Sequence, residues 1–335
     1  MEVSELIGLE HEADIGAVRR RFAALAAIAG LDESRTSDAA LIATELATNV
    51  LRHAGHGGAL LGAAPAPGAP RPGVAIAVWD RGPGMDVAAC LRDGMSTAGT
   101  AGVGLGAVSR LASRWDAYAP RGKGTVIAAY IAPAREPPEQ PRPRFQTGAV
   151  CLPYPGLPVR GDAWDVHATG DVATLVVCDG LGHGEGAAEA SRAVLGAFRE
   201  RPGDPPAAIL DRASRAARPT RGAAATVVRV DLAAREATIS AVGNVTAWIA
   251  GDDPRQLVTQ HGTLGHTMPR LREERYAFPA GATLVVASDG LKSRLELDTQ
   301  AGLLTHDPMV IAAALWRDHH RGRDDATAVI LREAR

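Results

Sequence analysis

The sequence predicts an α+β protein made of two domains. Its 335 residues are more than one domain usually holds and enough for two domains, each with its own core. Between the halves lies the stretch APAREPPEQPRPRFQ, whose five prolines and five charges exclude a helix interior or a central strand. The second half is rich in strands that do not alternate regularly with helices. We therefore expect domains at residues 1–133 and 147–335, joined by a semi-rigid linker at 134–146.

The pattern of the first half predicts a strand, two helices, a strand, a loop, a helix and a strand. One helix is expected from Asp14 to Ala29, ended by Gly30. A second should begin after Asp32 or Ser34, either of which can cap it, and run to about Ala54. The Pro/Gly-rich stretch at 55–73 is expected to be an internal loop. The remaining elements are strands at 74–80 and 124–131 and a helix opening at 103–112.

The second half contains six apolar runs with the length and β-branched content of strands. They are expected at residues 171–179, 224–232, 236–244, 245–251, 282–289 and 326–332. Helical periodicity predicts three helices between them, at 186–199, 205–217 and 309–319.

The composition excludes several classes of protein. Hydrophobic residues make up 46% of the chain, which indicates a folded globular protein. A formal net charge of -2 gives no reason to expect nucleic acid as a partner. No apolar run approaches the roughly 20 residues of a membrane-spanning helix, and the acidic start lacks a signal-peptide pattern. The three cysteines are far apart in the sequence, so we expect a reducing cytoplasm rather than a disulfide framework.

The segment LIATELATNVLRHA places two polar residues on one face of the second predicted helix. Glu45 and Asn49 are four residues apart, beside an apolar stripe that includes Leu46 and Val50. A carboxylate there can accept a proton from an attacking hydroxyl or water, and a carboxamide oxygen can bind Mg²⁺. Alone, the pair is more typical of a solvated helix face.

Two glycine-rich turns follow this helix. Asp80 ends the strand VAIAVWD and is followed by Gly82 and Gly84, which allow a ligand to approach the backbone. Further on, Gly102, Gly104 and Gly106 lead into a helix N-terminus, where backbone N–H groups and the helix dipole suit phosphate. The spacing matches neither GxGxxG nor GxxxxGK[ST], which excludes a Rossmann or P-loop site.

The ordered set ExxxN, DxGxG, GxGxG and Gly122-Lys123-Gly124-Thr125 resembles that of the GHKL ATPase/kinase superfamily. Within it, residues 2–132 are similar to the anti-sigma-factor serine kinases of the RsbW and RsbT type. The resemblance implies the Bergerat α/β sandwich and ATP with Mg²⁺ as cofactor. It makes Glu45 the catalytic base, Asn49 the Mg²⁺ ligand and Asp80 the adenine-binding residue. Gly82, Gly84, Gly102, Gly104 and Gly106 would line the nucleotide, with Thr125 near the base.

The second half carries acidic residues next to predicted strands. Asp162 precedes a strand, Asp179-Gly180 and Asp289-Gly290 end strands, and Asp324 and Asp325 precede the last strand. Carboxylates that converge at one edge of a sandwich repel each other and favour hard cations such as Mg²⁺ or Mn²⁺. Two such ions can activate a bridging water and hold a phosphate.

The ordered set GD, VVCDGLGHG, ASDGL and RDDAT resembles the PPM-type metal-dependent phosphatases of the SpoIIE, RsbU and RsbX branch. This resemblance covers residues 147–332 and implies an α-β-β-α sandwich with two Mg²⁺ or Mn²⁺ ions. Asp179 would be catalytic by bridging both metals, and Gly180 would offer its carbonyl. The resemblance assigns the remaining metal ligands to Asp162, Asp289, Asp324 and Asp325.

Together the resemblances imply a cytoplasmic partner-switching regulator. Its kinase-type domain would phosphorylate serine or threonine on STAS-domain anti-sigma-factor antagonists or stressosome-type proteins, and its phosphatase domain would remove such phosphate. Two alternatives remain open. The ATP domain could be only a nucleotide sensor, against which the presence of Glu45 argues, or the chain could be chiefly an ATP-dependent module that sequesters a partner.

Overall fold

The computed structural model describes residues 2–63, 73–92, 104–133, 143–295, 297 and 302–334. The chain divides into two compact units. The first comprises Met1–Pro141 together with Thr305–Arg317, and the second comprises Arg142–Leu304 and Asp318–Arg335. The first unit is therefore not contiguous in sequence, because thirteen residues from near the C-terminus belong to it.

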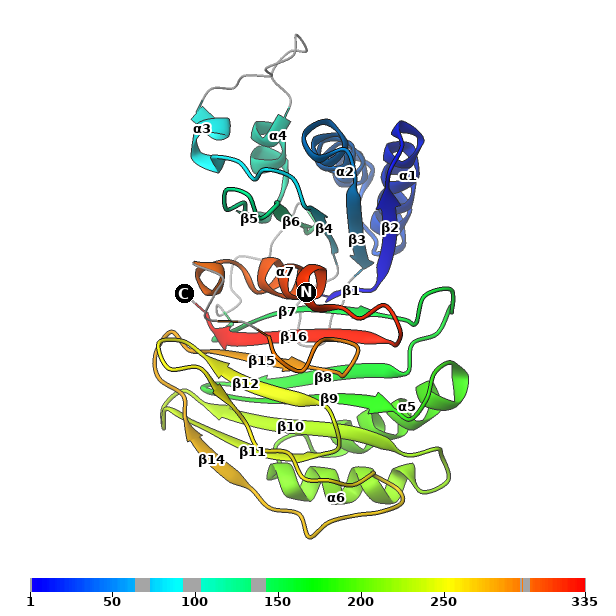
Figure 1. Cartoon of the computed structure of the whole chain (residues 1–335), viewed down its shortest axis with the longest axis vertical. Coiled ribbons are helices and arrows are strands. Elements are labelled where there is room, and N and C mark those ends of the chain that lie inside the picture. The colour runs from blue at the N-terminus through cyan, green and yellow to red at the C-terminus, as the bar shows by residue number, and fades with distance from the viewer. Residues whose placement is uncertain are drawn as a thin grey trace. The chain divides into compact units, whose positions relative to one another are not determined.

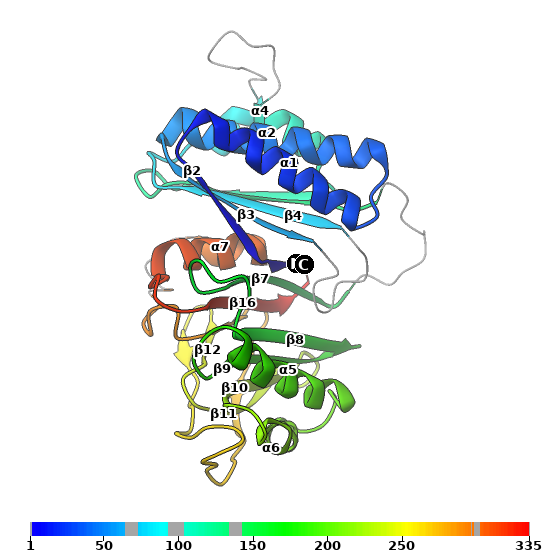
Figure 2. The same ribbon diagram turned by 90° about the vertical axis from the view of Figure 1, so that its right-hand side faces the viewer.

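The first unit is built on one antiparallel sheet with helices packed on one face (Figure 2). After the short strand β1 (Glu2–Val3), the sheet has the strand order β2 (Glu5–Leu9), β3 (Gly57–Ala63), β4 (Val74–Asp80), β6 (Val126–Ile131) and β5 (Arg114–Tyr118). The helices α1 (Glu12–Ile28) and α2 (Glu33–Ala54) bury Phe22, Ile42 and Leu46 against it. Two shorter helices follow, α3 (Val87–Arg92) and α4 (Gly104–Leu111).

The ends of α2 follow from local sequence. The Asp32 carboxylate accepts a hydrogen bond from the Arg35 N–H and so satisfies one of the free donors at the helix start. Gly55 then ends the helix with a φ of 77°, a left-handed conformation that favours glycine. The predictions for α1, α2, α4, β4 and β6 are confirmed to within a few residues.

The sequence predicts a loop at 55–73, and this prediction is wrong for β3. The glycines of this strand reflect close backbone packing rather than a turn. A Cβ on Gly57 would lie 2.2 Å from the Trp79 carbonyl oxygen, and one on Gly62 would lie 2.0 Å from that of Glu2. Strand β5 also lacks a prediction, because RWDAY is too short and polar to give a period-2 signal.

The second unit is a sandwich of two antiparallel sheets (Figure 1). One sheet contains, in order, β7 (Phe145–Leu152), β16 (Ala326–Glu333), β15 (Thr283–Ala287), β12 (Thr246–Ala250) and β13 (Arg255–Gln256). The other contains β14 (Glu274–Ala277), β11 (Glu236–Val242), β10 (Ala223–Asp231), β9 (Val172–Gly180) and β8 (Asp162–Thr169). Phe145 and Gln146, which the sequence places in the linker, are the first residues of β7.

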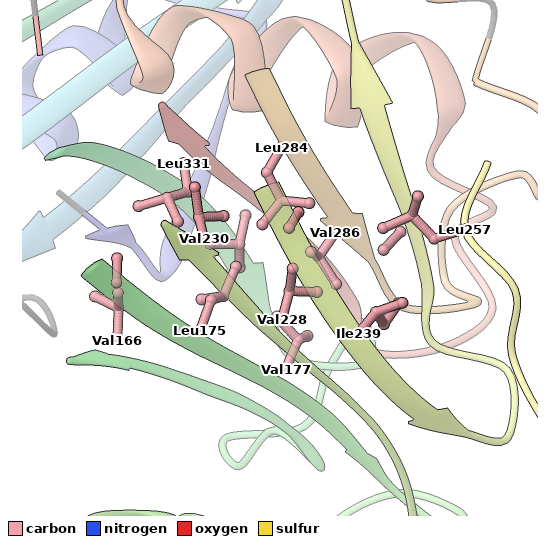
Figure 3. Close-up of a cluster of buried hydrophobic side chains, with 14 of the residues drawn as sticks. Val166, Leu175, Val177, Val228, Val230, Ile239, Leu257, Leu284, Val286 and Leu331 are labelled. Atoms are coloured by element: carbon pink, nitrogen blue, oxygen red, sulfur yellow. The ribbon is translucent and has the colours of Figure 1, made fainter. Parts of the chain in front are cut away.

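Strand alternation divides the core of this unit into two layers. Leu175 and Val177 of β9 point between the sheets, where they meet Leu284 and Val286 of β15 (Figure 3). Val176 and Cys178 face the other way and pack under the helices α5 (Glu185–Glu200) and α6 (Pro206–Ala217). The α+β class, all six strands predicted for this half and the helices α5 and α6 are confirmed.

The last helix, α7 (Pro308–His319), follows the 3₁₀ turn η1 (Leu303–Thr305) and matches its prediction closely. Its residues up to Arg317 belong to the first unit. Met309 to Leu315 are all fully buried, as expected for a helix that is apolar on every side. Among the described residues, none of the helices combines the length and apolarity that crossing a bilayer requires.

Candidate functional sites

The face of α2 presents Glu45 and Asn49 one helical turn apart, both half-buried. The apolar stripe formed by Ile42, Leu46 and Val50 packs into the core and fixes the orientation of this face. Burial raises the pKa of Glu45 above its ordinary value, and the nearby Arg52 opposes this. A carboxylate with a raised pKa is a better proton acceptor near neutral pH.

The turn after β4 is built around Asp80, which is 6% exposed. Its Oδ1 accepts hydrogen bonds from Gly82 N at 2.8 Å and from Thr125 N at 3.1 Å, so the structure brings these three predicted residues together. A Cβ on Gly82 would lie 2.8 Å from Ala54 Cβ, which places the turn beside the end of α2. Gly84 has a φ of 74°, and a Cβ there would lie 2.4 Å from the Pro120 carbonyl oxygen. Glycine is therefore required at both positions.

The start of α4 carries the remaining glycines of the first set. Gly104 is the first residue of α4, and a Cβ there would meet nothing within 4 Å. A Cβ on Gly106 would meet only the flexible end of Arg110, at 3.2 Å. Gly102 lies outside the described residues.

The acidic residues of the second unit gather at one end of the sandwich. Asp162 opens β8 and Asp179 lies near the end of β9, directly opposite each other in the antiparallel register. Asp162 is 1% exposed, and its Oδ2 accepts a hydrogen bond of 2.6 Å from the Ser288 hydroxyl. Its Oδ1 is buried without a partner among the described residues. A buried carboxylate oxygen without a partner destabilises the fold unless it binds a cation or a proton.

Three more acidic residues come from the opposite sheet. Asp289 follows β15, and its Oδ2 accepts a hydrogen bond of 2.7 Å from the Asn244 side chain. Asp324 and Asp325 precede β16, and Asp324 Oδ1 accepts from the Asp325 N–H at 2.9 Å. Gly290 allows these two loops to meet, since a Cβ there would lie 1.9 Å from the Asp325 carbonyl oxygen.

Gly180 is fixed by the start of α5. A Cβ on it would lie 2.0 Å from the Ala187 carbonyl oxygen, so only glycine fits between β9 and that helix. Its N–H donates to the Gly161 carbonyl at 3.2 Å, which keeps the ends of β8 and β9 together. Asp162 and Asp179 are therefore held by backbone bonds rather than by flexible loops.

Burial raises the pKa of three of these carboxyl groups, Asp162, Asp179 and Asp289, and repulsion from neighbouring carboxylates adds to it. Burial raises the pKa of Asp179 to about 9, with added repulsion from Asp162, Asp289, Asp324 and Asp325. Burial likewise raises the pKa of Asp162 to about 7, although the Ser288 hydroxyl opposes this. The pKa of Asp289 is raised by burial and by Asp324. A group of this kind binds protons or hard cations.

The side chains present have the oxygen donors of a cation site, but they are not arranged in coordination geometry around one point. As the side chains lie, no three His, Cys, Asp or Glu residues of the described part of the chain converge closely enough to hold a metal ion. The buried, unpartnered Asp162 Oδ1 and the mutual repulsion of the carboxylates nevertheless favour a bound cation. Oxygen donors without sulfur or imidazole match Mg²⁺ or Mn²⁺.

The structure also reveals residues that orient the carboxylates and that the sequence motifs do not identify. The Ser288 Oγ accepts from the buried Thr327 N–H at 3.0 Å, so its single proton is directed to Asp162. Asn244 orients Asp289 from the turn between β11 and β12. The adjacency of Ser288 to Asp289 is a signal that could identify it, whereas Asn244 lies 45 residues from its partner.

Comparison with known proteins agrees with the division of the chain into two units. Residues 10–131 match the model of the histidine kinase-like ATPase domain, and residues 169–334 match that of stage II sporulation protein E (SpoIIE). A search of curated proteins found no match.

Two solved structures are similar to somewhat more than half of the chain. One, described as the bacterial stressosome, is 25% identical with a TM-score of 0.52, covering 56% of this chain and 99% of its own. The other, RsbX in complex with magnesium, is 22% identical with a TM-score of 0.52, covering 58% and 98%. The second likeness bears on the fold alone. By the family matches, the chain carries a histidine kinase-like ATPase domain at residues 10–131 and a SpoIIE domain at residues 169–334.

Proposed function

We propose that the chain is a metal-dependent phosphatase for phosphoserine and phosphothreonine on a STAS-domain protein. The observation that carries this is the pairing of Asp162 and Asp179 across β8 and β9, electrostatically coupled to Asp289 and Asp324. The similarity to a stressosome structure supports a partner of the stressosome kind.

Asp179, Asp162, Asp289 and Asp324 would hold two Mg²⁺ or Mn²⁺ ions, with the Gly180 carbonyl as a further ligand. When bound, such ions supply an activated water and neutralise charge on the phosphoryl group. The chain contributes orientation: Ser288 fixes Asp162, and Asn244 fixes Asp289. Asp325 is better suited to positioning, because both of its oxygens already accept backbone N–H groups.

We infer that the first unit binds ATP with Mg²⁺ and transfers its terminal phosphate to serine or threonine of the same class of partner. Asp80, oriented by Gly82 and Thr125, would accept from the adenine amino group. Gly84 and the start of α4, including Gly102, Gly104 and Gly106, would border the nucleotide, and Asn49 would bind its Mg²⁺. Glu45, whose pKa is raised by burial, would accept the hydroxyl proton.

The phosphatase is tested with the full chain and p-nitrophenyl phosphate in the presence of Mn²⁺. Chelation should stop hydrolysis, and Asp179→Asn should lower the rate by more than about 100-fold, since even groups one shell beyond a metal's ligands contribute 10–100-fold. The matched control is Asp171→Asn. Asp171 lies in the turn between β8 and β9, and its exposed carboxylate pairs with Arg144. Activity that survives chelation, or an Asp179→Asn protein as fast as its control, would overturn the assignment.

The kinase is tested by adding labelled ATP to the chain and the STAS protein encoded nearest to it. Glu45→Ala should keep nucleotide affinity in calorimetry but lose phosphoryl transfer on the order of 10²–10⁴-fold. Glu33→Ala, in the first turn of the same helix, is the control. Nucleotide binding without transfer in the wild type would favour the sensor alternative.

A further inference from the structure

Thirteen residues of the C-terminal part, Thr305–Arg317, belong to the compact unit that carries the nucleotide-site residues. They lie on the opposite side of the first unit's sheet from α1 and α2 (Figure 2). Polar contacts hold this segment at both of its ends.

The first end is held by β5. Asp116 Oδ2 accepts a hydrogen bond of 2.6 Å from the Asp307 N–H, and both Asp116 oxygens lie 3.1 Å from the His306 Nδ1. Arg114 forms an ion pair of 3.0 Å with Asp307. Asp307 in turn accepts from the Met309 N–H at 2.9 Å and so caps the start of α7. The position of α7 is thus set by side chains of the ATPase sheet.

The second end is held by three consecutive residues at the nucleotide turn. Trp316 contacts Trp79 edge to face, with ring centroids 6.0 Å apart. The Arg317 guanidinium donates to the Asp80 carbonyl at 3.3 Å, and the Arg81 guanidinium donates to the Arg317 carbonyl. Arg317 is 3% exposed, so these bonds are shielded from water. The Asp80 carbonyl and the side chains of the residues on either side of Asp80 are therefore tied to the end of α7.

The residues directly after Arg317 are tied to the acidic centre. The Lys292 N–H donates to the His319 carbonyl at 2.9 Å, and the Arg321 N–H donates to the Gly290 carbonyl at 2.9 Å. These two hydrogen bonds hold the loop that begins at Asp289. Three residues after Arg321 the chain reaches Asp324. Within eight residues, the backbone runs from a contact with the nucleotide turn to Asp324, and on the way it hydrogen-bonds to the loop that begins at Asp289.

We propose that residues 305–321 couple the nucleotide site to the phosphatase centre, with Arg317 as the positioning residue at the nucleotide end. This rests on the proposed function, since it presumes a nucleotide at Asp80 and metal at Asp289 and Asp324. A nucleotide that shifts the Asp80–Gly82 turn moves Arg317, and the last turn of α7 with the residues that follow it passes that shift to the loops at 289–292 and 319–324. Linkage requires the reverse as well, so metal binding should change nucleotide affinity.

The test uses the full chain with ADP and Mg²⁺ as the nucleotide probe, so that no phosphate is transferred. One readout is hydrogen exchange in peptides covering 286–294 and 318–327, and the other is hydrolysis of p-nitrophenyl phosphate at saturating Mn²⁺. In the wild type, saturating ADP should change amide exchange in both peptides and change the hydrolysis rate by about 5-fold or more.

Arg317→Ala should reduce both ADP responses towards none while retaining ADP binding and basal hydrolysis. Arg317→Lys, which keeps a charge and a donor, should restore part of the response. Arg21→Ala is the matched control, because Arg21 on α1 pairs with Glu5 and should respond as the wild type does. A merely structural role for Arg317 would lower the melting temperature without changing the ratio of rates with and without ADP.

The outcomes separate this inference from the function on which it rests. A wild type that binds ADP and hydrolyses p-nitrophenyl phosphate, yet shows neither response, would refute the coupling and leave the function standing. Equal responses in Arg317→Ala and the wild type would refute the role of Arg317. A wild type that neither binds ADP nor hydrolyses the ester would overturn both. If Arg317→Ala fails to fold, the hydrogen-exchange measurement on the wild type still tests whether the two sites are coupled.

Discussion

Asp325 holds the chain that connects β7 to β8. Its Oδ1 accepts from the Tyr154 N–H at 2.7 Å and its Oδ2 accepts from the Gly161 N–H at 2.8 Å. Gly161 precedes Asp162, so Asp325 fixes the backbone from which one of the central carboxylates projects. The residue is 2% exposed, and both bonds to its carboxylate are short.

The first prediction concerns Asp325→Asn. The geometry predicts a cost in stability, because an amide NH₂ would face one of two backbone donors and leave it unpaired, at about 1–3 kcal/mol. Urea unfolding of Asp325→Asn and Asp324→Asn, compared with the wild type, checks this. An Asp325→Asn protein with an unchanged midpoint would show that the loop rearranges around the amide.

The motif residues could be predicted from sequence because each has a local signal. Asp179 and Asp289 each end an apolar run and precede glycine, and Asp80 precedes two spaced glycines. Ser288, Asn244 and Arg317 act through contacts across the fold, and single-sequence patterns carry no trace of such contacts. The sequence predicts Asp325 as a ligand, whereas we propose it as a positioning residue. This role too depends on a contact across the fold, since Tyr154 is 171 positions away.

At the scale of elements, the predicted helices and strands are those with strong periodicity or long apolar runs. Strands β10 and β16 are buried over nearly their whole length and read as continuous apolar segments. Strand β3 reads as a loop because its glycines make room for Trp79 and Glu2, a tertiary requirement that overrides local propensity. Helix α7 was predictable as a helix, but its membership in the first unit was not.

The second prediction is a pH dependence at the start of α7. Burial alone would raise the pKa of Asp116, but the His306 side chain and the Asp307 and Ala117 N–H groups outweigh it and hold the pKa below its ordinary value. A depressed carboxyl pKa stabilises the fold above the unfolded value, and this stabilisation is lost as pH falls through the folded value. Asp116→Asn should therefore be less stable than the wild type near neutral pH, with the difference shrinking below about pH 4.

Urea midpoints followed by tryptophan fluorescence between about pH 3 and pH 7 measure this difference. Asp171→Asn provides the control, as its partner Arg144 lies in an exposed pair of little expected energy. A stability difference that stays constant down to pH 3 would mean that the Asp116 carboxylate does not anchor the segment.

At the scale of the molecule, the units defined by packing differ from the halves that the proline-rich stretch suggests. Composition marks where the chain changes character, but it cannot show that a later segment returns to an earlier sheet. The strands β4 and β6 are buried along nearly their whole length, so both faces of that sheet are covered. A sheet with one bare apolar face would expose a patch that soluble monomers rarely tolerate.

The third prediction follows for fragments of the chain. Residues 1–141 alone lack Thr305–Arg317, so Trp79 loses Trp316 and Asp116 loses Asp307. Joining residues 303–319 to this fragment through a Gly/Ser linker should raise its melting temperature by roughly 5–10 °C, because several kcal/mol of apolar and polar contacts return. Binding of a hydrophobic dye should fall at the same time. The matched control carries Trp316→Ala and Arg317→Ala in the joined segment and should gain little. Equal melting temperatures and dye binding for all three fragments would mean that the first unit is complete without its C-terminal segment, and that α7 contributes nothing to the ATPase sheet.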